Sequence, residues 1–336
     1  AITRLPARWP IDTGLSMSDA LFLVADVGGT NTRVAMAEGG IVLPDTIRRY
    51  SNRDFANLAP VLRQYRADLP GPDPVGACVA VAGPVAEGRA ELTNLDWSID
   101  TARLIEATSA RQGAILNDLQ AQGHALGHLS ADACQTVIAV DGVPEAVRLV
   151  IGVGTGFNAA PVHQTAQGRL VPACEAGHAN LPIRTEAELR LCTFASTSHG
   201  FPAVEDVLSG RGLEQVYRWL ASEAGSTDEL LAAEIMQRVT SDPRAQAAVQ
   251  QFIRILGTVV GNLSLIHLPL GGVYLVGGVA RAMAPHLAAM GFAEAFRDKG
   301  RFAGFMANFP VHLVTDDFAA LTGCAAHLRE IIEHSQ

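Results

Sequence analysis

Lysine is almost missing from this sequence. Lys299 is the single lysine among the 336 residues, so all but one of the 25 basic side chains are arginine. Lysine Schiff-base chemistry is therefore restricted to one position, and the G-x-x-x-x-G-K-[ST] phosphate loop is excluded. Any phosphate-binding site in this chain has to be built in another way.

Paired cysteines and clustered positive charges are also missing. The five cysteines are an odd number, are widely spaced and form no C-x-x-C pair, which indicates reduced cytosolic thiols and neither a disulfide framework nor a zinc site. The net charge is −9 with histidines neutral, and Lys and Arg are not clustered. Because binding to a phosphate backbone needs such a cluster, we expect no nucleic-acid partner.

One uncharged segment has the hydropathy of a membrane span. Residues 255–280 contain no Asp, Glu, Lys or Arg, but Asn262, His267 and Pro269 interrupt the run. This pattern predicts a buried helix that ends near Leu268, followed by a buried strand, VYLV. Residues 1–20 contain no apolar stretch of signal-peptide length, and we interpret them as a loose extension. We therefore expect a cytoplasmic protein with no membrane partner.

The β-rich segments are arranged in two similar groups. Runs at 21–28 and 32–38 flank a glycine turn, and a third strand through 41–51, a helix over 54–69 and a buried strand at 75–83 follow. A dinucleotide fold would instead place a helix directly after the first glycine turn. Runs at 148–156 and 157–164 repeat the strand–turn–strand pattern, and a long helical region at 185–268 follows. The duplication predicts two domains that face each other across a cleft.

The two glycine turns have two interpretations. Closely spaced backbone N–H groups can bind phosphate oxygens where no Cβ blocks their approach, but a tight hairpin also explains the glycines. Asp26 ends a buried strand beside the first turn, where a carboxylate is well placed to hold Mg²⁺ through water. The second turn, Gly154-Thr155-Gly156, has the same two interpretations.

Two further groups of polar residues stand out. Asn117 and Asp118 follow a short strand and precede helical spacing, so one of them could simply cap a helix. Glu175 and His178 are three residues apart, but no second Glu-x-x-His pair is present to complete a di-metal bundle. They are either a surface pair or part of a site that needs both hydrogen-bond donors and acceptors, such as a sugar site.

Seven runs taken together resemble the bacterial glucokinase family. They are ADVGGTNTR (25–33), LNDL (116–119), GVGTG (152–156), CEAGH (174–178), VEDVLSGRGL (204–213), GGVYLVGGV (271–279) and FRDKGRF (296–302). They occur in the order seen in that family, and the match covers nearly the whole chain after residue 20. The cysteine-rich zinc motif of the related repressor and sugar-kinase group is absent, so the resemblance is to the zinc-free branch.

The resemblance implies an α/β fold of the two-domain actin/hexokinase-like ATPase type. Such a fold contains ribonuclease H-like duplicated β-β-β-α-β units and an interdomain cleft. We expect an extension at 1–20, a small domain at 21–117, a large domain at 118–324 and a terminal helix at 325–334 that packs on the small domain. The family also suggests a homodimer.

The resemblance further implies ATP-dependent phosphorylation of glucose to glucose 6-phosphate, with ATP and Mg²⁺ and without zinc. Asp118 would be the catalytic base, and Asp26 would hold Mg²⁺ through water. The implied glucose-binding residues are Asn94, Asn117, Asp118, Glu175, His178 and Glu205. The implied nucleotide-binding residues are Asp26, Gly28, Gly29, Thr30, Asn31, Gly154, Thr155, Gly156, Gly277, Gly278 and Val279.

Two positions depart from the family pattern, because Asn158 and Ala176 stand where glycine is usual. Asn tolerates a left-handed backbone and Ala does so poorly, so another hexose or an amino sugar remains an alternative substrate. A non-catalytic sugar sensor is a further alternative. It would need a DNA-reading module for which residues 1–20 are too few, and the presence of both Asp26 and Asp118 favours an enzyme.

Overall fold

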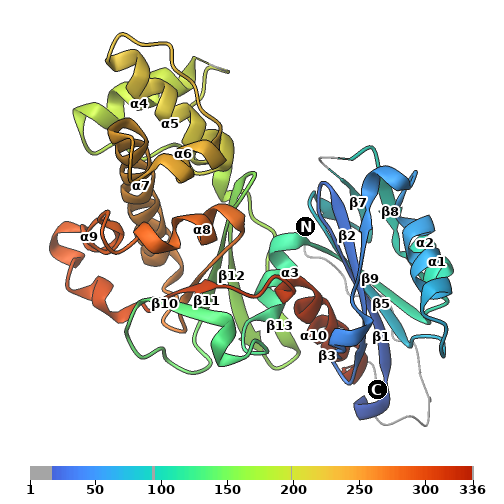
Figure 1. The fold of residues 1–336 in the computed structure, drawn as a ribbon. Helices are drawn as coiled ribbons and strands as arrows, with labels where there is room; N and C mark the ends of the chain where they lie inside the picture. The colour runs from blue at the N-terminus through green and yellow to red at the C-terminus, as the bar shows by residue number, and fades with distance from the viewer. Residues whose placement is uncertain (1–16, 93–94, 198, 335–336) are drawn as a thin grey trace. The chain divides into compact units, whose positions relative to one another are not determined.

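The computed structural model describes residues 17–92, 95–197 and 199–334. The chain divides into two compact units, in each of which helices pack against a central sheet (Figure 1). Unit 1 consists of Ala1–Leu129, Thr165–Leu170 and Asp317–Gln336, and unit 2 consists of Ser130–Gln164 and Val171–Asp316.

Unit 1 is built on a sheet in which β3, β2, β1, β5 and β9 follow one another, with β4 also paired to β2. Its strands are β1 (Leu21–Val27), β2 (Asn31–Glu38), β3 (Ile41–Val42), β4 (Arg48–Ser51), β5 (Gly76–Val81) and β9 (Gln112–Asn117). The predicted hairpin is confirmed, since β1 and β2 are antiparallel, and β5 and β9 run parallel to β1. A smaller sheet contains β6 (Val85–Ala86), β7 (Arg89–Glu91) and β8 (Ser98–Asp100).

The single strand predicted over 41–51 is wrong. A 3-10 turn, Pro44–Thr46, separates β3 from β4. Pro44 has no N–H to donate to a strand ladder, and its fixed φ suits the first position of such a turn. The Thr46 hydroxyl then completes the turn by donating to the Leu43 carbonyl at 2.6 Å and accepting the Met36 N–H at 2.9 Å.

Helices cover both faces of the unit 1 sheet (Figure 1). Leu23, Ala25 and Val27 of β1 share a hydrophobic cluster with α1 (Leu58–Asp68) and α2 (Thr101–Thr108). The alternate residues Phe22 and Val24 share another with α3 (Asp118–Ala125) and α10 (Ala319–Glu333). Because neither face of β1 meets solvent, its sequence is an almost continuous apolar run.

Unit 1 extends beyond the boundaries that the sequence suggests. The unit continues to Leu129 where we expected residue 117, and the helix expected over 325–334 begins at Ala319. α3 joins unit 1 because it packs closely along α10, so closely that a Cβ on Gly323 would overlap the Ala121 carbonyl. Residues 1–16 of the expected extension lie outside the described residues.

Unit 2 repeats the strand arrangement of unit 1. Its strands are β10 (Cys134–Ile138), β11 (Arg148–Val153), β12 (Phe157–Thr165), β14 (Val273–Val276) and β15 (Val311–Val314), and the chain continues from β12 into the short strand β13 (Gly168–Leu170). β11 and β12 form an antiparallel hairpin, β14 is parallel to β11, and β15 is parallel to β14. The order β12, β11, β14, β15 therefore matches β2, β1, β5, β9, which confirms the predicted duplication.

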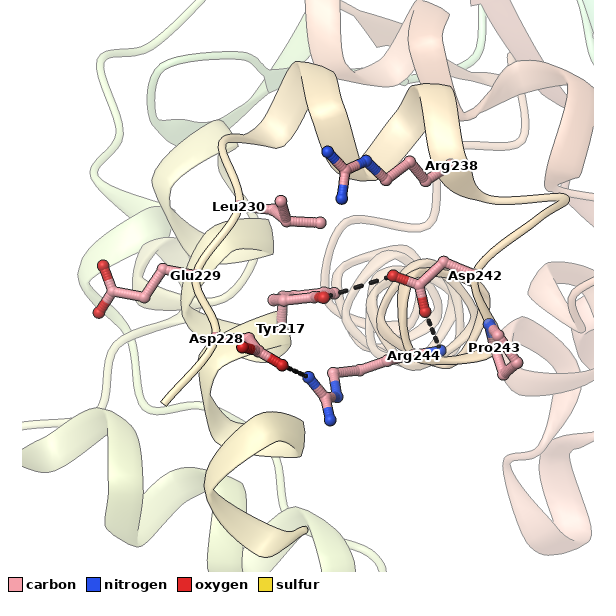
Figure 2. A pocket seen from close by; sticks show the side chains of 8 residues that line it. All are labelled: Tyr217, Asp228, Glu229, Leu230, Arg238, Asp242, Pro243 and Arg244. Carbon is pink, nitrogen blue, oxygen red and sulfur yellow. Dashed lines mark hydrogen bonds and ion pairs between the residues drawn. The ribbon is translucent and has the colours of Figure 1, made fainter. Parts of the chain in front are cut away.

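Among the described residues of unit 2, four α-helices lie in the sequence between the β11–β12 hairpin and β14. They are α4 (Glu186–Ser196), α5 (Gly210–Glu223), α6 (Ala232–Arg238) and α7 (Pro243–His267), and α8 (Gly278–Met283) and α9 (Phe292–Arg297) follow β14. Figure 2 shows a pocket at α5, α6 and α7, lined by Tyr217, Asp228, Glu229, Leu230, Arg238, Asp242, Pro243 and Arg244. Two of its charged groups form an ion pair, with Arg244 Nη1 2.8 Å from Asp228 Oδ2.

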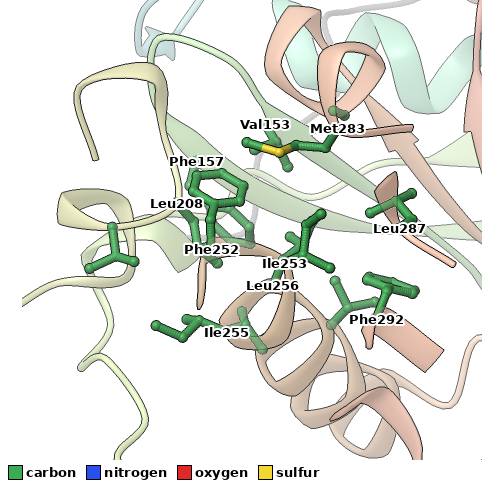
Figure 3. Packing of buried hydrophobic residues seen from close by; sticks show 14 of the residues in the cluster. Val153, Phe157, Leu208, Phe252, Ile253, Ile255, Leu256, Met283, Leu287 and Phe292 are labelled. Carbon is green, nitrogen blue, oxygen red and sulfur yellow. The ribbon is translucent and has the colours of Figure 1, made fainter. Parts of the chain in front are cut away.

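The long apolar helix predicted before VYLV is the core helix of unit 2. α7 begins after the Asp242 N-cap and ends at His267, with Leu268 in the left-handed region at φ 49°, and VYLV is β14. α7 is long and apolar enough to cross a membrane, but 61% of its most apolar window is buried inside the fold. Figure 3 shows Phe252 of this helix beside Phe157, and both belong to one hydrophobic cluster with Val153; Val153 and Phe157 flank the second glycine turn.

A charged network inside unit 1 joins α3 and the segment before residue 171 to α10. Glu330 Oε2 accepts the Arg169 N–H at 3.0 Å and lies 3.7 Å from His124 Nδ1, and Glu330 Oε1 lies 3.3 Å from Arg169 Nη1. Burial alone would raise the pKa of Glu330, but His124 and Arg169 outweigh burial and lower it. A lowered carboxyl pKa means that the ionised form stabilises the fold, above the pKa of the unfolded chain.

We expect Glu330→Gln to lower the free energy of unfolding by about 1–3 kcal/mol at pH 7, because the amide leaves the Arg169 charge without its buried partner. The deficit should shrink as the pH falls below 4.5, the usual Glu value, because the unfolded chain then binds a proton at Glu330 that the folded protein, with its lowered pKa, binds only at a lower pH. Urea unfolding at pH 7 and pH 4 measures both effects. Glu333→Gln, which breaks an exposed pair with Arg329 on the same helix, is the control and should change stability much less. Equal losses in the two variants would contradict this account.

Candidate active site

Unit 1 brings Asp26 and Asp118 to the same edge of its sheet. Asp26 is the penultimate residue of β1, and Asp118 directly follows β9. β1 and β9 lie on either side of β5 and run parallel to it, so their carboxyl ends meet at one edge. In open α/β sheets this edge is where ligands bind.

The helix-cap interpretation is confirmed for Asn117, so Asp118 is not needed as the N-cap of α3. Asn117 Oδ1 accepts the Leu119 N–H at 3.0 Å, and Gln120 Oε1 accepts the Asn117 N–H at 3.1 Å, which completes a capping box. The Asn117 amide also donates to the Gly83 carbonyl at 3.0 Å. Asn117 therefore holds the start of α3 in place, and its sugar-binding role stays a prediction.

Both carboxyl groups have raised pKa values. Asp118 is exposed at its outer side, yet desolvation by the surrounding protein raises the pKa of its carboxyl to about 6. The Leu119 N–H opposes this shift, and the negative charge of Asp26 adds to it. Burial also raises the pKa of Asp26, against the attraction of Arg33, whose Nη1 lies 3.4 Å from Asp26 Oδ2. A pair of carboxyl groups with raised pKa values is the electrostatic situation that a divalent cation relieves.

Arg33 is a structural partner of Asp26. Besides that ion pair, its Nη1 donates to the Asp317 carbonyl at 3.2 Å, and its guanidinium lies over the Phe318 ring, 5.8 Å from the centroid. These contacts fix the Asp26 carboxylate relative to the segment that leads into α10.

The first glycine turn is hydrogen-bonded to Asn52 and is exposed to solvent at Gly29 and Thr30. The Asn52 amide donates to the Gly28 carbonyl at 2.7 Å, and the Asn52 N–H donates to the Thr30 carbonyl at 2.9 Å, while Gly29 and Thr30 are exposed. Neither Gly28 nor Gly29 adopts the left-handed region that a two-residue hairpin turn of type I′ requires. The type I′ requirement therefore does not explain these glycines, and their role in binding phosphate stays a prediction.

The second glycine turn in unit 2 lies against the N-terminus of α5. The Gly210 N–H donates to the Gly154 carbonyl at 2.9 Å, and Gly154 has open space where a Cβ would stand. At Gly156 a Cβ would collide with the Glu205 carboxylate, so this glycine makes room for Glu205. Gly277 has φ +105° and packs on the Val153 carbonyl, which explains that glycine structurally.

Three predicted sugar-binding residues come together in unit 2. Glu205 Oε2 accepts the Phe157 N–H at 2.9 Å, so the first residue of β12 holds this carboxylate. Glu175 and His178 belong to the segment 174–178, and His178 Nε2 lies 3.9 Å from Glu175 Oε2. A Cβ on Gly177 would meet the Phe157 carbonyl, which places this segment directly beside Glu205 and β12.

The two departures from the family pattern do not strain the backbone. Ala176 is the first residue of a 3-10 turn, Ala176–His178, and neither it nor Asn158 adopts a left-handed conformation. The Thr155 and Val279 roles stay predictions, and Asn94 lies outside the described residues. None of the candidate residues lines the pocket of Figure 2.

Sequence reasoning missed two residues that organise these sites. Asn52 fixes the first glycine turn, and its Oδ1 accepts the Thr32 hydroxyl at 2.8 Å. Ser209 caps α5 by accepting the Gly212 N–H at 3.0 Å, and its hydroxyl donates to the Glu205 carbonyl at 2.8 Å. A serine before a helical run is a known capping signal, whereas the Asn52 contacts join distant segments and leave no local pattern.

Comparisons with known proteins agree with this geometry. The glucokinase family model matches residues 23–331. The glucokinase of Pectobacterium atrosepticum is 32% identical over 314 residues, which cover 92% of this chain and 97% of that protein. The crystal structure of a glucokinase from an Antarctic psychrotroph is 32% identical with a TM-score of 0.83, covering 92% of this chain and 98% of that one. A glucokinase of the ROK family from Streptomyces griseus, in complex with glucose and AMPPNP, has the same fold at 19% identity with a TM-score of 0.61, covering 92% and 99% of the two chains.

We expect Asp118→Asn to raise the thermal unfolding temperature at pH 8. The folded protein raises the pKa of Asp118, so its ionised form costs stability at a pH above that value, and the amide removes this cost while an oxygen still accepts the Leu119 N–H. The difference from wild type should vanish near pH 4, as the carboxyl becomes protonated. Differential scanning calorimetry at the two pH values measures it, and a variant less stable than wild type at pH 8 would show that the carboxylate supports the fold.

Proposed function

The chain belongs to the glucokinase family, and from this premise we propose that it transfers the γ-phosphoryl group of ATP to the 6-hydroxyl of glucose, giving glucose 6-phosphate and ADP. The chain is a sugar kinase with a two-domain actin/hexokinase-like fold, and curated relatives at about 30% identity carry the name glucokinase. The observation that carries the proposed chemistry is the exposed Asp118 carboxylate, held at a strand end beside Asp26 with a raised pKa.

Asp118 is proposed as the general base. Transfer to an alcohol needs a group that accepts the hydroxyl proton as the sugar oxygen forms its bond to the γ-phosphorus and the bond to the ADP oxygen breaks. A carboxyl with a pKa of about 6 is ionised at neutral pH and is a stronger base than an ordinary Asp. Because Asn117 caps α3, Asp118 is held at the first helical position with its second oxygen free of the Leu119 bond.

ATP is proposed to bind through backbone N–H groups. The chain has one lysine, so the exposed turn at Gly28–Asn31 and the turn at Gly154–Gly156 would supply donors for phosphate oxygens. Gly277, Gly278 and Val279 would lie against the adenosine. Mg²⁺, when bound, would neutralise phosphate charge, with Asp26 holding it through water. The AMPPNP in the Streptomyces griseus glucokinase supports ATP as the donor.

Glu175, His178 and Glu205 of unit 2 are proposed as sugar ligands, and Asn94, Asn117 and Asp118 of unit 1 are also proposed as sugar ligands. Carboxylates accept hydrogen bonds from neighbouring hydroxyls, and an imidazole can donate or accept. Excluding water while the sugar is bound would limit wasteful hydrolysis of ATP.

We also propose a cytoplasmic homodimer that carries out the first step of glucose use in glycolysis. Five free cysteines suit a reducing compartment. The homodimer rests on the family resemblance alone, and light scattering of the purified protein tests it. The proposal includes no zinc, nucleic-acid or membrane partner. The sensor alternative is disfavoured because a sensor has no need of a base at Asp118.

Asp118→Asn should lower kcat by at least about a hundredfold while leaving glucose affinity within a few-fold, because the amide keeps size and one acceptor but cannot take the proton. In the wild type, kcat/KM should fall as the pH drops through about 6, where the base becomes protonated. A coupled ADP-release assay from pH 5 to 8, with calorimetry for glucose binding, measures both. A variant that retains more than about a tenth of kcat would exclude Asp118 as the base.

Glucose should be preferred over mannose and N-acetylglucosamine by at least about tenfold in kcat/KM, which corresponds to about 1.4 kcal/mol in transition-state stabilisation. Inverting C2 moves a donor away from its acceptor, and an acetamido group adds bulk and leaves a buried acceptor unpaired. The same assay across a sugar panel decides the matter. If mannose or N-acetylglucosamine is the better substrate, the glucose assignment fails and the alternative of another hexose or amino sugar takes its place.

A further inference from the structure

The side chains proposed to bind the sugar in unit 2 are held in different ways. Glu205 is anchored by its bond to the Phe157 N–H, and its side chain is 25% exposed. Glu175 and His178 are 74% and 68% exposed, and the contact between them is 3.9 Å long. Because a contact of that length between exposed groups is weak, the backbone of segment 174–178 determines where these two side chains lie.

One side chain binds that backbone on both sides of Glu175. The Asn158 amide donates to the Cys174 carbonyl at 2.5 Å, and Asn158 Oδ1 accepts the Ala176 N–H at 3.0 Å. Asn158 Oδ1 also accepts the N–H of Ala159 at 2.8 Å, which fixes the orientation of the amide on β12. An amide is suited to this arrangement because it carries a donor and an acceptor side by side.

The neighbouring contacts make Asn158 part of a single support. Phe157 holds Glu205 through its N–H, and its carbonyl lies against Gly177. Beyond His178, the Val204 N–H donates to the Ala179 carbonyl at 2.9 Å and ties the end of the segment to the turn that carries Glu205. Phe157 and Asn158, the first two residues of β12, therefore hold Glu205 and the segment bearing Glu175 and His178 at a fixed separation.

We infer that Asn158 is a positioning residue for sugar binding, which fixes the backbone of residues 174–178 so that Glu175 and His178 meet the ligand at a set distance from Glu205. The inference rests on the proposed sugar-binding role of these three residues. It also accounts for an alanine at position 176, because an N–H bound to Asn158 keeps Ala176 in the 3-10 turn without a left-handed residue.

Asn158→Ala tests the inference, because it should change KM for glucose and leave KM for ATP nearly unchanged. The variant should raise KM for glucose roughly tenfold, since two hydrogen bonds to the segment are lost, and should leave KM for ATP within about twofold. Gln164→Ala, at an exposed position of the same strand, is the matched control and should change neither constant. A glucose KM within twofold of wild type, or equal increases in both constants, would overturn the inference.

A second readout does not depend on activity. Cys174 lies in the segment that Asn158 holds, whereas Cys78 and Cys324 are buried in unit 1. Iodoacetamide labelling, followed peptide by peptide with mass spectrometry, should show faster modification of Cys174 in Asn158→Ala and unchanged protection of Cys78 and Cys324. Unchanged Cys174 labelling contradicts the inference. If the wild-type enzyme fails to phosphorylate glucose, the proposed function fails, while the labelling still decides whether Asn158 holds the segment.

Asn158→Asp provides the test if the alanine variant does not fold. Its carboxylate can still accept the Ala176 N–H but places a second acceptor against the Cys174 carbonyl, so the contact at that end becomes repulsive. We expect a glucose KM raised at least as much as in Asn158→Ala and faster labelling of Cys174. A wild-type glucose KM in this variant would overturn the inference.

Discussion

The desolvation of two carboxylates at one sheet edge is the constraint on which this site depends. Asp26 and Asp118 are brought there by the parallel run of β1, β5 and β9, and each has a raised pKa. Among the described contacts, the cation beside the pair is Arg33, which forms an ion pair with Asp26. Arg33 also contacts the Asp317 carbonyl and the Phe318 ring. The edge is thus left with negative charge that Mg²⁺ can balance and with one carboxylate that is a strengthened base.

The scarcity of lysine and the two glycine turns both bear on how this chain would bind phosphate. A chain with a single lysine can bind phosphates through backbone N–H groups, which approach a ligand closely where side chains are absent. In unit 1 the turn is held from below by Asn52, and in unit 2 the corresponding turn abuts the start of α5. The same hairpin in unit 2 also carries Phe157 and Asn158, so one short stretch of chain supports both the proposed phosphate contacts and the proposed sugar contacts.

Local sequence patterns predicted the elements whose cause is local. Both hairpins follow from β-rich runs around glycines, and α7 and β14 follow from an apolar run broken near Leu268. The interruption between β3 and β4 also has a local cause, Pro44, but the prediction of a single strand over 41–51 did not take it into account. The end of unit 1 at Leu129 could not be predicted in this way, because it depends on α3 packing against α10, nearly 200 residues later.

The residues of the candidate site also differ in whether their cause is local in the sequence. Asp26, Asp118 and the glycine turns were found because a carboxylate or glycine at a strand end is visible in a short motif, whereas Asn52 and Asn158 act through hydrogen bonds to residues 16 to 24 positions away.

The most direct test of the account is a crystal structure with glucose, Mg²⁺ and a non-hydrolysable ATP analogue. We expect the glucose 6-hydroxyl within about 2.6–3.2 Å of the Asp118 carboxylate and in line with the γ-phosphorus. A 6-hydroxyl directed away from Asp118, with another group in reach of its proton, would contradict the central claim.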